Sequence, residues 1–281
     1  MLTISYSLLN SHIFHILDGF FNLKLFAMRK LLLTFVAIAV MGTAWATNKD
    51  RLTFEKGQNQ LTVENITTTG FNFNLKIGEA YLNDAKSNEG DYFILQTKGF
   101  TKSFHIGNPN LPTKSKLIQI PFGADVKVKV VSEKFEIIDL GAKGFTGKVL
   151  PCQPSVAKCD EGEELPFEFN EKVYQTDAFY ANELVSFEES GIMRGTRLGR
   201  IEMNPFQYNP VKNQLKVYTE LTVEVTFDGA DMGKTEHMKD IYGNSFFNSM
   251  LTKTMNYTND AKPLNQNEPV KMLIIADRMF E

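Results

Sequence analysis

Residues 71–77 read Phe-Asn-Phe-Asn-Leu-Lys-Ile, with apolar and polar side chains in strict alternation. Residues 126–130 read Val-Lys-Val-Lys-Val and repeat the pattern. Successive side chains of a β-strand point to opposite faces, so a period of two predicts strands that bury one face and expose the other. These two segments therefore favour antiparallel sheets packed around a buried face.

Segments of the same kind recur along most of the chain. Further strands are predicted at 61–66, 92–95, 117–120, 135–138, 184–187, 197–203, 214–218 and 221–227. Residues 209–213, Asn-Pro-Val-Lys-Asn, are typical of a turn between two of these strands. Short strands separated by Gly, Pro and Asn indicate an antiparallel sandwich or barrel. We predict an all-β fold, an antiparallel β-sandwich over residues 47–235.

The pattern changes after Gly229. Residues 240–257 predict one amphipathic helix, so that residues 236–269 would hold a helix and a polar linker. Residues 270–276, Val-Lys-Met-Leu-Ile-Ile-Ala, are typical of a central parallel strand buried on both faces. A lone strand of this kind is not stable by itself. We therefore expect residues 270–281 to be the start of a truncated α/β domain from a longer protein.

An export signal is predicted from Met28 to Ala46. Met28-Arg29-Lys30 forms a basic start, and residues 31–41 form an apolar run. Small residues precede the expected cleavage between Ala46 and Thr47. The run is too short for a permanent membrane helix, which needs about 20 residues. We expect a secreted or cell-surface product with no stable membrane span after cleavage.

Residues 1–27 are apolar and aromatic and fall outside this signal. They are either a second hydrophobic segment that makes a double anchor, or an extension produced by a start codon assigned too far upstream. We favour the second interpretation because Met28 alone heads a complete signal peptide.

Composition and motifs exclude several classes of function. The net charge is −3 and no basic stripe is present, which argues against a nucleic-acid partner. The sequence has no paired-cysteine zinc pattern, no His-Glu-x-x-His and no Gly-rich phosphate loop. We therefore expect no metal site, no cofactor and no complete catalytic site in this chain.

Cys152 and Cys159 are the two cysteines, seven positions apart. In an exported protein, two such cysteines more often form a disulfide than supply a catalytic nucleophile. A catalytic Cys/His pair with His105 or His237 is the alternative. The disulfide would close a small loop and stabilise it by about 2.5 kcal/mol. Lys158 would lie on this loop. Two roles are open for Lys158: a solvent-exposed side chain on a surface hairpin closed by the disulfide, or a side chain that inserts into a partner's pocket. From spacing alone, the first is favoured.

Several motifs together resemble the prodomains of gingipain-type cysteine peptidases, peptidase family C25. They cover roughly residues 60–281. The motifs are Gly-Asn-Pro-Asn-Leu-Pro at 107–112, Ile-Gln-Ile-Pro at 118–121, Met-Arg-Gly-Thr-Arg at 193–197, Asn-Pro-Phe-Gln-Tyr-Asn-Pro at 204–210 and Leu-Lys-Val-Tyr at 215–218. Lys-Met-Leu-Ile-Ile-Ala at 271–276 resembles the first strand of the family's catalytic domain.

The resemblance implies a β-sandwich prodomain that assists folding of the peptidase and keeps it latent. Its partner would be the cognate C25 catalytic domain, in cis in the full-length protein, with the catalytic Cys and His beyond Glu281. In the family, a basic loop residue enters the specificity pocket from eight positions before the proline of an Ile-Pro-aromatic motif. Leu165-Pro166-Phe167 matches that motif, which implies Lys158 as the inhibitory residue and Lys148 as the alternative.

Three hypotheses follow for the function. The chain is a latency and folding propeptide, a stand-alone cell-surface β-sandwich that binds glycan or protein, or the N-terminal part of an active peptidase precursor. Activation of a precursor would require cleavage in or near the linker, and Lys253 and Lys262 are the candidate sites.

Overall fold

The computed structural model describes residues 50–54, 57–155, 165–180, 183–243 and 245–258. The chain divides into two compact units, Met1–Asn48 and Lys49–Glu281, and every described residue belongs to the second. The described strands are β1 (Arg51–Thr53), β2 (Gln60–Thr67), β3 (Gly70–Lys76), β4 (Glu79–Ser87), β5 (Gly90–Gln96), β6 (Lys114–Ile120), β7 (Asp125–Asp139), β8 (Lys148–Val149), β9 (Val185–Met193), β10 (Thr196–Met203), β11 (Phe206–Asn209) and β12 (Gln214–Asp228). The described helices are α2 (Glu171–Gln175), α3 (Met232–Tyr242) and α4 (Ser245–Leu251).

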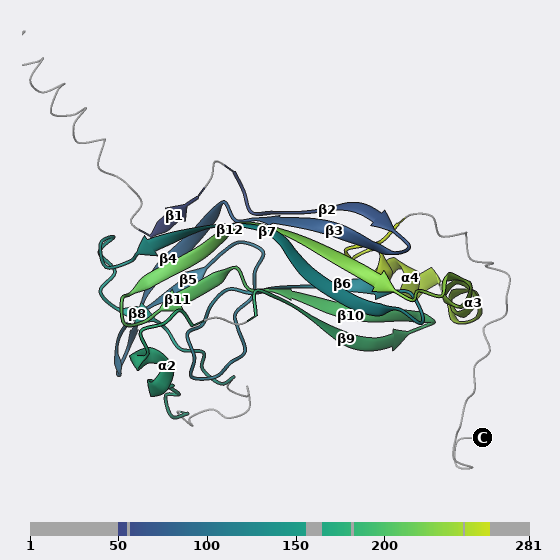
Figure 1. Ribbon diagram of the computed structural model, residues 1–281. Helices are drawn as coiled ribbons and strands as arrows, with labels where there is room; N and C mark the ends of the chain where they lie inside the picture. Colours follow the sequence, from purple (N-terminus) through teal and green to yellow (C-terminus); the bar gives the residue numbers. More distant parts are fainter. Residues whose placement is uncertain (1–49, 55–56, 156–164, 181–182, 244, 259–281) are drawn as a thin grey trace, which may run out of the picture. The chain divides into compact units, whose positions relative to one another are not determined.

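The strands form three sheets (Figure 1). The first has the order β1-β4-β5-β8, and the second has the order β6-β10-β9. The third has the order β11-β12-β3-β2, with β7 also paired to β12. Every pairing between these strands is antiparallel except the one between β5 and β8. The predicted all-β class with antiparallel, sandwich-type packing is thus confirmed.

The alternating segments bury the face that the sequence predicts. Phe71, Phe73 and Leu75 are each at most 2% exposed, whereas the asparagines between them remain partly accessible. A single hydrophobic cluster joins these side chains to residues of the other two sheets, such as Leu82 and Ile201. The three sheets therefore share one core, and burial of its apolar surface is the main term that holds the unit together.

The two longest described strands, β12 and β7, pair with each other in the third sheet. β7 joins the segments predicted at 126–130 and 135–138, and β12 joins those predicted at 214–218 and 221–227. The two strands pair along their length and run side by side in Figure 1. Their register shifts twice, between Tyr218 and Glu220 and between Thr222 and Val223. These irregularities interrupt the local alternation, which is why each strand was predicted as two.

The single helix predicted over 240–257 is wrong. α3 begins earlier because the side chain of Asp231 accepts a hydrogen bond from the backbone N–H of Lys234, which caps the first turn. It ends at Tyr242, with Gly243 as the C-terminal cap, and α4 follows. The next residues turn back onto β6, where the backbone N–H of Met255 donates to the carbonyl oxygen of Leu117 at 2.8 Å. The strand predicted at 270–276 lies outside the described residues.

Candidate functional site

Two chain segments meet at the foot of the loop that contains Lys158. Residues 150–153 follow β8, and residues 168–170 lead into α2. The side-chain Nε2 of Gln153 donates to the carbonyl oxygen of Glu168 at 2.8 Å, and its Oε1 accepts from the backbone N–H of Glu168 at 3.0 Å. These two bonds fix the spacing between the two ends of the loop. We call residues 150–153 and 168–170 the loop base.

A third segment supports the loop base from one side. The backbone N–H of Gly107 donates to the carbonyl oxygen of Cys152 at 2.8 Å. The backbone N–H of Cys152 donates to the carbonyl oxygen of Asn108, also at 2.8 Å. On the other side, the N–H of Asn170 donates to the carbonyl oxygen of Gly107 at 3.0 Å. The Gly-Asn-Pro motif at 107–109 therefore bonds to both halves of the loop base.

Gly107 has a backbone conformation that explains the glycine in this motif. Its φ angle is +79°, in the left-handed region that side chains with a Cβ disfavour. A Cβ at this position would lie 3.3 Å from the backbone nitrogen of Asn170. A larger residue would therefore strain the turn and push against the loop base.

Helix α2 ties the second half of the loop base to β8. The side chain of Asn170 caps it by accepting from the backbone N–H of Val173 at 3.3 Å. Tyr174 is buried, and its hydroxyl donates to the carbonyl oxygen of Val149 at 2.6 Å. Burial raises the pKa of Tyr174 far above its ordinary range. The sequence prediction missed α2, although the pair Asn170-Glu171 is a typical helix start.

The two candidate inhibitory lysines differ in their placement. Lys158 lies outside the described residues, within the loop between Gln153 and Glu168. Lys148 is exposed and belongs to β8, where it pairs in parallel register with Tyr92 of β5. Its Nζ lies 5.9 Å from the centroid of the Tyr174 ring. The alternative lysine is therefore part of a sheet edge and not of a loop.

Cys152 has a buried thiol at the loop base. The side chain is 7% exposed, and its Sγ donates to the carbonyl oxygen of Ser103 at 3.2 Å. Burial raises the pKa of the thiol, which makes it a poor nucleophile. Cys152 is free in the structure, and Cys159 lies outside the described residues. Their disulfide remains a prediction, as does the signal cleavage between Ala46 and Thr47, which also lies outside.

The two candidate activation sites lie in different surroundings. Lys253 is exposed but belongs to an ordered turn, and its backbone N–H donates to the carbonyl oxygen of Met250. Just beyond it, the side-chain amide of Asn256 bonds both the N–H and the carbonyl oxygen of Gln119, each at 2.8 Å. Lys262 lies outside the described residues. Cleavage at Lys253 would cut a segment that is bonded to β6.

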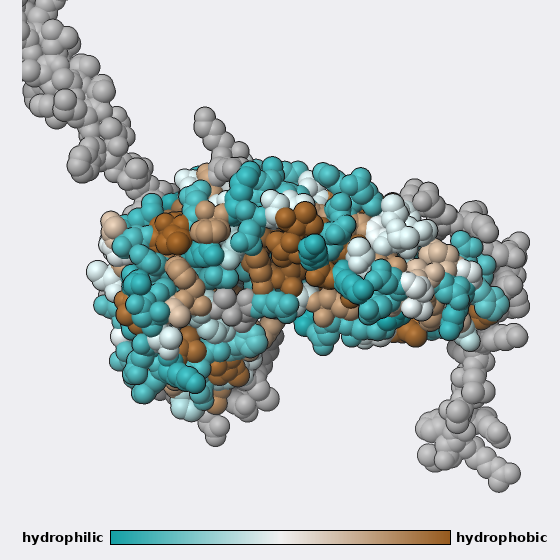
Figure 2. Space-filling view, viewed as in Figure 1, coloured by the Kyte–Doolittle hydropathy of each residue, from teal (hydrophilic) through white to brown (hydrophobic). Residues whose placement is uncertain are grey.

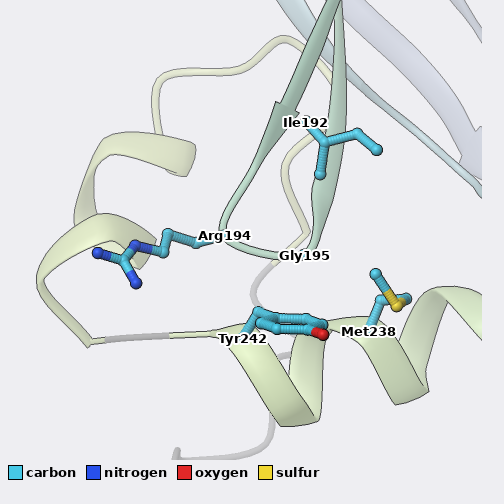
Figure 3. Close-up of a pocket in the computed structure, with 5 residues that line it drawn as sticks. All are labelled: Ile192, Arg194, Gly195, Met238 and Tyr242. Atoms are coloured by element: carbon cyan, nitrogen blue, oxygen red, sulfur yellow. The ribbon is translucent and has the colours of Figure 1, made fainter. Parts of the chain in front are cut away.

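A small hollow lies between the turn joining β9 to β10 and helix α3 (Figure 3). Its volume is about 280 Å³, and it is lined by Ile192, Arg194, Gly195, Met238 and Tyr242. In Figure 3 the side chain of Arg194 points away from Met238, and its guanidinium carbon lies 5.0 Å from the centroid of the Phe247 ring. The remaining side chains of the lining carry no acid–base pair, so this hollow does not resemble an active site.

The described residues contain no group of three or more His, Cys, Asp and Glu side chains arranged to hold a metal ion. Among the same residues, no helix is long and apolar enough to cross a membrane. The candidate site in the described part of the chain is the loop base, which is held by the hydrogen bonds of Gln153, Gly107 and Asn170.

Comparison with known proteins identifies relatives of one kind. The family model described as Propeptide_C25 matches residues 85–262. Lys-gingipain HG66 of Porphyromonas gingivalis is 31% identical over 257 residues, which cover 90% of this chain and 15% of that protein. Gingipain R2 of the same species is 25% identical over 241 residues, 81% of this chain and 30% of that protein. The chain thus spans about 15% of the length of the Lys-gingipain relative.

Two solved structures resemble the fold. One concerns the zymogenic latency of gingipain K from Porphyromonas gingivalis; it is 32% identical, with a TM-score of 0.60, and the match covers 64% of this chain and 98% of that chain. The other is a complex of the pro- and mature domains of Porphyromonas gingivalis RgpB, with a TM-score of 0.57 and coverage of 71% and 98%. Its identity is 20%, so it supports the fold alone.

Proposed function

The chain belongs to the C25 propeptide family, and from this premise we propose that it binds the catalytic domain of its own peptidase and keeps that domain latent. The proposed partner is a gingipain-like cysteine endopeptidase in the same precursor. The proposed activity is binding without turnover, together with assistance in folding the peptidase. The gingipain K structure, which concerns zymogenic latency, supports this proposal.

We propose that Lys158 enters the specificity pocket of the peptidase. The observation that carries this step is the attachment of both loop ends through Gln153 and Glu168. A loop whose ends are already fixed loses less conformational entropy on binding than a free segment does. A lysine ammonium that enters an acidic, desolvated pocket would be a dominant contact. Lys148 is the weaker candidate because it belongs to β8.

A restrained loop also gives a physical reason for inhibition in place of cleavage. A substrate is cut only when its scissile bond sits in the reactive geometry. A loop tied at its base would bind through its lysine while holding the neighbouring peptide bond out of that geometry. The lysine at 158 further suggests a lysine-selective pocket, in line with the name of the Lys-gingipain relative.

The proposal includes export through a cleaved signal from Met28 to Ala46 to the cell surface or medium. Its support is the basic start, the apolar run and the small residues before Thr47. Latency during transit would protect the cell from a peptidase that acts outside it. Release would require cleavage between the β-sheet unit and the peptidase domain, with Lys253 and Lys262 as the candidate positions.

An inhibition assay tests the proposal. The unit Lys49–Glu281 has its own core and is added to mature Lys-gingipain. We expect inhibition, and we expect Lys158→Ala to raise the inhibition constant about 30-fold or more. Lys158→Arg should retain most of the inhibition, and Lys148→Ala is the matched control. Absence of inhibition at micromolar concentration would contradict the proposal and favour a stand-alone cell-surface binding module.

A further inference from the structure

Four large apolar side chains are exposed at and beside the loop base. Phe104 is 75% exposed, Ile106 54%, Leu165 44% and Phe169 36%. We call these four residues the loop-base patch. Figure 2 shows hydrophobic surface on the part of the unit that carries α2 in Figure 1. Single exposed apolar residues are ordinary, but a group of them indicates a surface that contacts another molecule.

A backbone hydrogen bond brings two members of this patch, Ile106 and Phe169, close together. Phe104 and Ile106 lie on either side of His105, in the segment that ends at Gly107. Phe169 precedes Asn170, whose N–H donates to the carbonyl oxygen of Gly107 at 3.0 Å. Ile106 and Phe169 therefore flank one hydrogen bond between two chain segments. Leu165 is the first described residue after the loop.

The patch is held on a fixed backbone. Ser103, next to Phe104, is buried, and its backbone N–H donates to the side-chain Oδ1 of Asn110 at 3.2 Å. The ring of Phe169 stacks on Tyr174, with centroids 4.4 Å apart and an angle of 27° between the planes. Tyr174 is itself held by its bond to Val149. Aromatic side chains fixed in this way lose little entropy when they pack against a partner.

The length of the loop determines what must face this patch. Lys158 is five residues after Gln153, so its Cα lies at most about 18 Å from the Cα of Gln153 even in a fully extended chain. When Lys158 occupies the specificity pocket, the surface around that pocket is therefore close to the loop base. We infer that the loop-base patch is a docking surface for the peptidase catalytic domain, which packs an apolar rim of its pocket against Phe104, Ile106 and Phe169. This inference rests on the proposed function.

Another exposed apolar region provides a comparison. Val131 on β7 is 58% exposed, and Phe135 and Ile137 on the same strand are also accessible. The Nζ of Lys216 lies 4.0 Å from the centroid of the Phe135 ring, so a charged side chain covers part of this region. Val131 is as exposed as Ile106 and does not belong to the loop base. It therefore serves as the matched control position.

Inhibition of mature Lys-gingipain by Lys49–Glu281 tests the inference through three variants. We expect Phe104→Ser with Ile106→Ser to raise the inhibition constant about 10- to 100-fold, because truncation of anchor residues commonly has effects of this size. Val131→Ser should leave it unchanged. Lys158→Ala reports on the proposed function by itself. Thermal unfolding of each variant establishes that it is folded.

Hydrogen exchange on the unaltered unit gives a second readout that does not depend on the variants. With Lys-gingipain present, amides at 103–107 and 165–169 should exchange more slowly, whereas those at 130–137 should not change. The inference is overturned if the double variant inhibits normally while Lys158→Ala does not, or if the patch shows no protection in an inhibited mixture. It is also overturned if the patch proves to join two copies of the unit, seen as a dimer that the double variant dissociates without a change in inhibition. If Lys49–Glu281 does not inhibit at all, both the proposed function and this inference fail.

Discussion

The side-chain amide of Gln153 pairs with the backbone of Glu168 through a donor and an acceptor bond of 2.8 and 3.0 Å. The two residues are 15 positions apart and exchange one donor and one acceptor bond, as paired residues do in an antiparallel sheet. The energetic contribution of this pair to folding is small because both groups are accessible to water. Its effect on the loop is larger, since it removes the freedom of the two loop ends to separate.

Gln153→Ala should loosen the loop without unfolding the unit. We expect the free energy of unfolding to fall by about 1 kcal/mol, the usual value of such bonds, while inhibition weakens several-fold. Limited proteolysis between residues 154 and 167 should become faster. Gln207→Ala, which removes the same side chain from β11, is the control. Equal proteolysis rates for the two variants would contradict the role given to Gln153.

Tyr174→Phe should destabilise the unit and change its response to alkaline pH. Loss of the bond to the carbonyl oxygen of Val149 costs about 1–2 kcal/mol near neutral pH. The folded pKa of Tyr174 is raised by burial, whereas the unfolded pKa is about 10. The contribution of Tyr174 to the free energy of unfolding is therefore complete below about pH 10. It is lost as the pH rises further, because only the unfolded state releases the phenol proton.

Urea unfolding on both sides of that pH measures the effect. The variant should show a shallower alkaline decline in the free energy of unfolding than the unaltered protein. Tyr242→Phe, at an exposed position, is the control and should change neither quantity. An unaltered alkaline decline in Tyr174→Phe would show that this phenol does not titrate in the unfolding reaction.

Gly195→Ala should displace α3 from the turn that joins β9 to β10. A Cβ there would lie 2.2 Å from the carbonyl oxygen of Met238, and the φ angle of +75° already disfavours alanine. We expect a loss of about 2–3 kcal/mol in the free energy of unfolding. Gly191→Ala is the matched control because its φ angle is +126° and no atom lies within 4 Å of its Cβ. If Gly195→Ala and Gly191→Ala lower the free energy of unfolding equally, the contact with Met238 does not contribute to the effect.

Cys152 should react slowly with iodoacetamide in the reduced, folded protein. Its thiol is buried and its pKa is raised, so little thiolate is present near neutral pH. After export, peptide mapping without reductant should find Cys152 joined to Cys159. Rapid alkylation of Cys152 in the folded state would contradict the burial. Alkylation of both cysteines in the exported, unreduced protein would contradict the disulfide.

Much of the sheet structure was predictable because strand alternation is a local property. Phe71, Phe73 and Leu75 identify the buried face of β3 without any knowledge of its neighbours. β4 was missed because Asn83 and Asp84 stand together and interrupt its alternation, although Leu82 just before them is buried. The helical region was placed too late because Asp231 caps α3 before the apolar residues begin.

The sequence alone determined the all-β class, most strand positions and the family resemblance, since alternation and short motifs are readable within a few residues. It also led to the prediction that Lys158 is the inhibitory residue, through the family resemblance. Only the tertiary structure decided how that loop is held. Gly107, Cys152 and Asn170 are far apart in the sequence and meet through backbone hydrogen bonds, which any residue except proline can donate. No side-chain pattern encodes such contacts, so the loop base became visible only once the chain had folded.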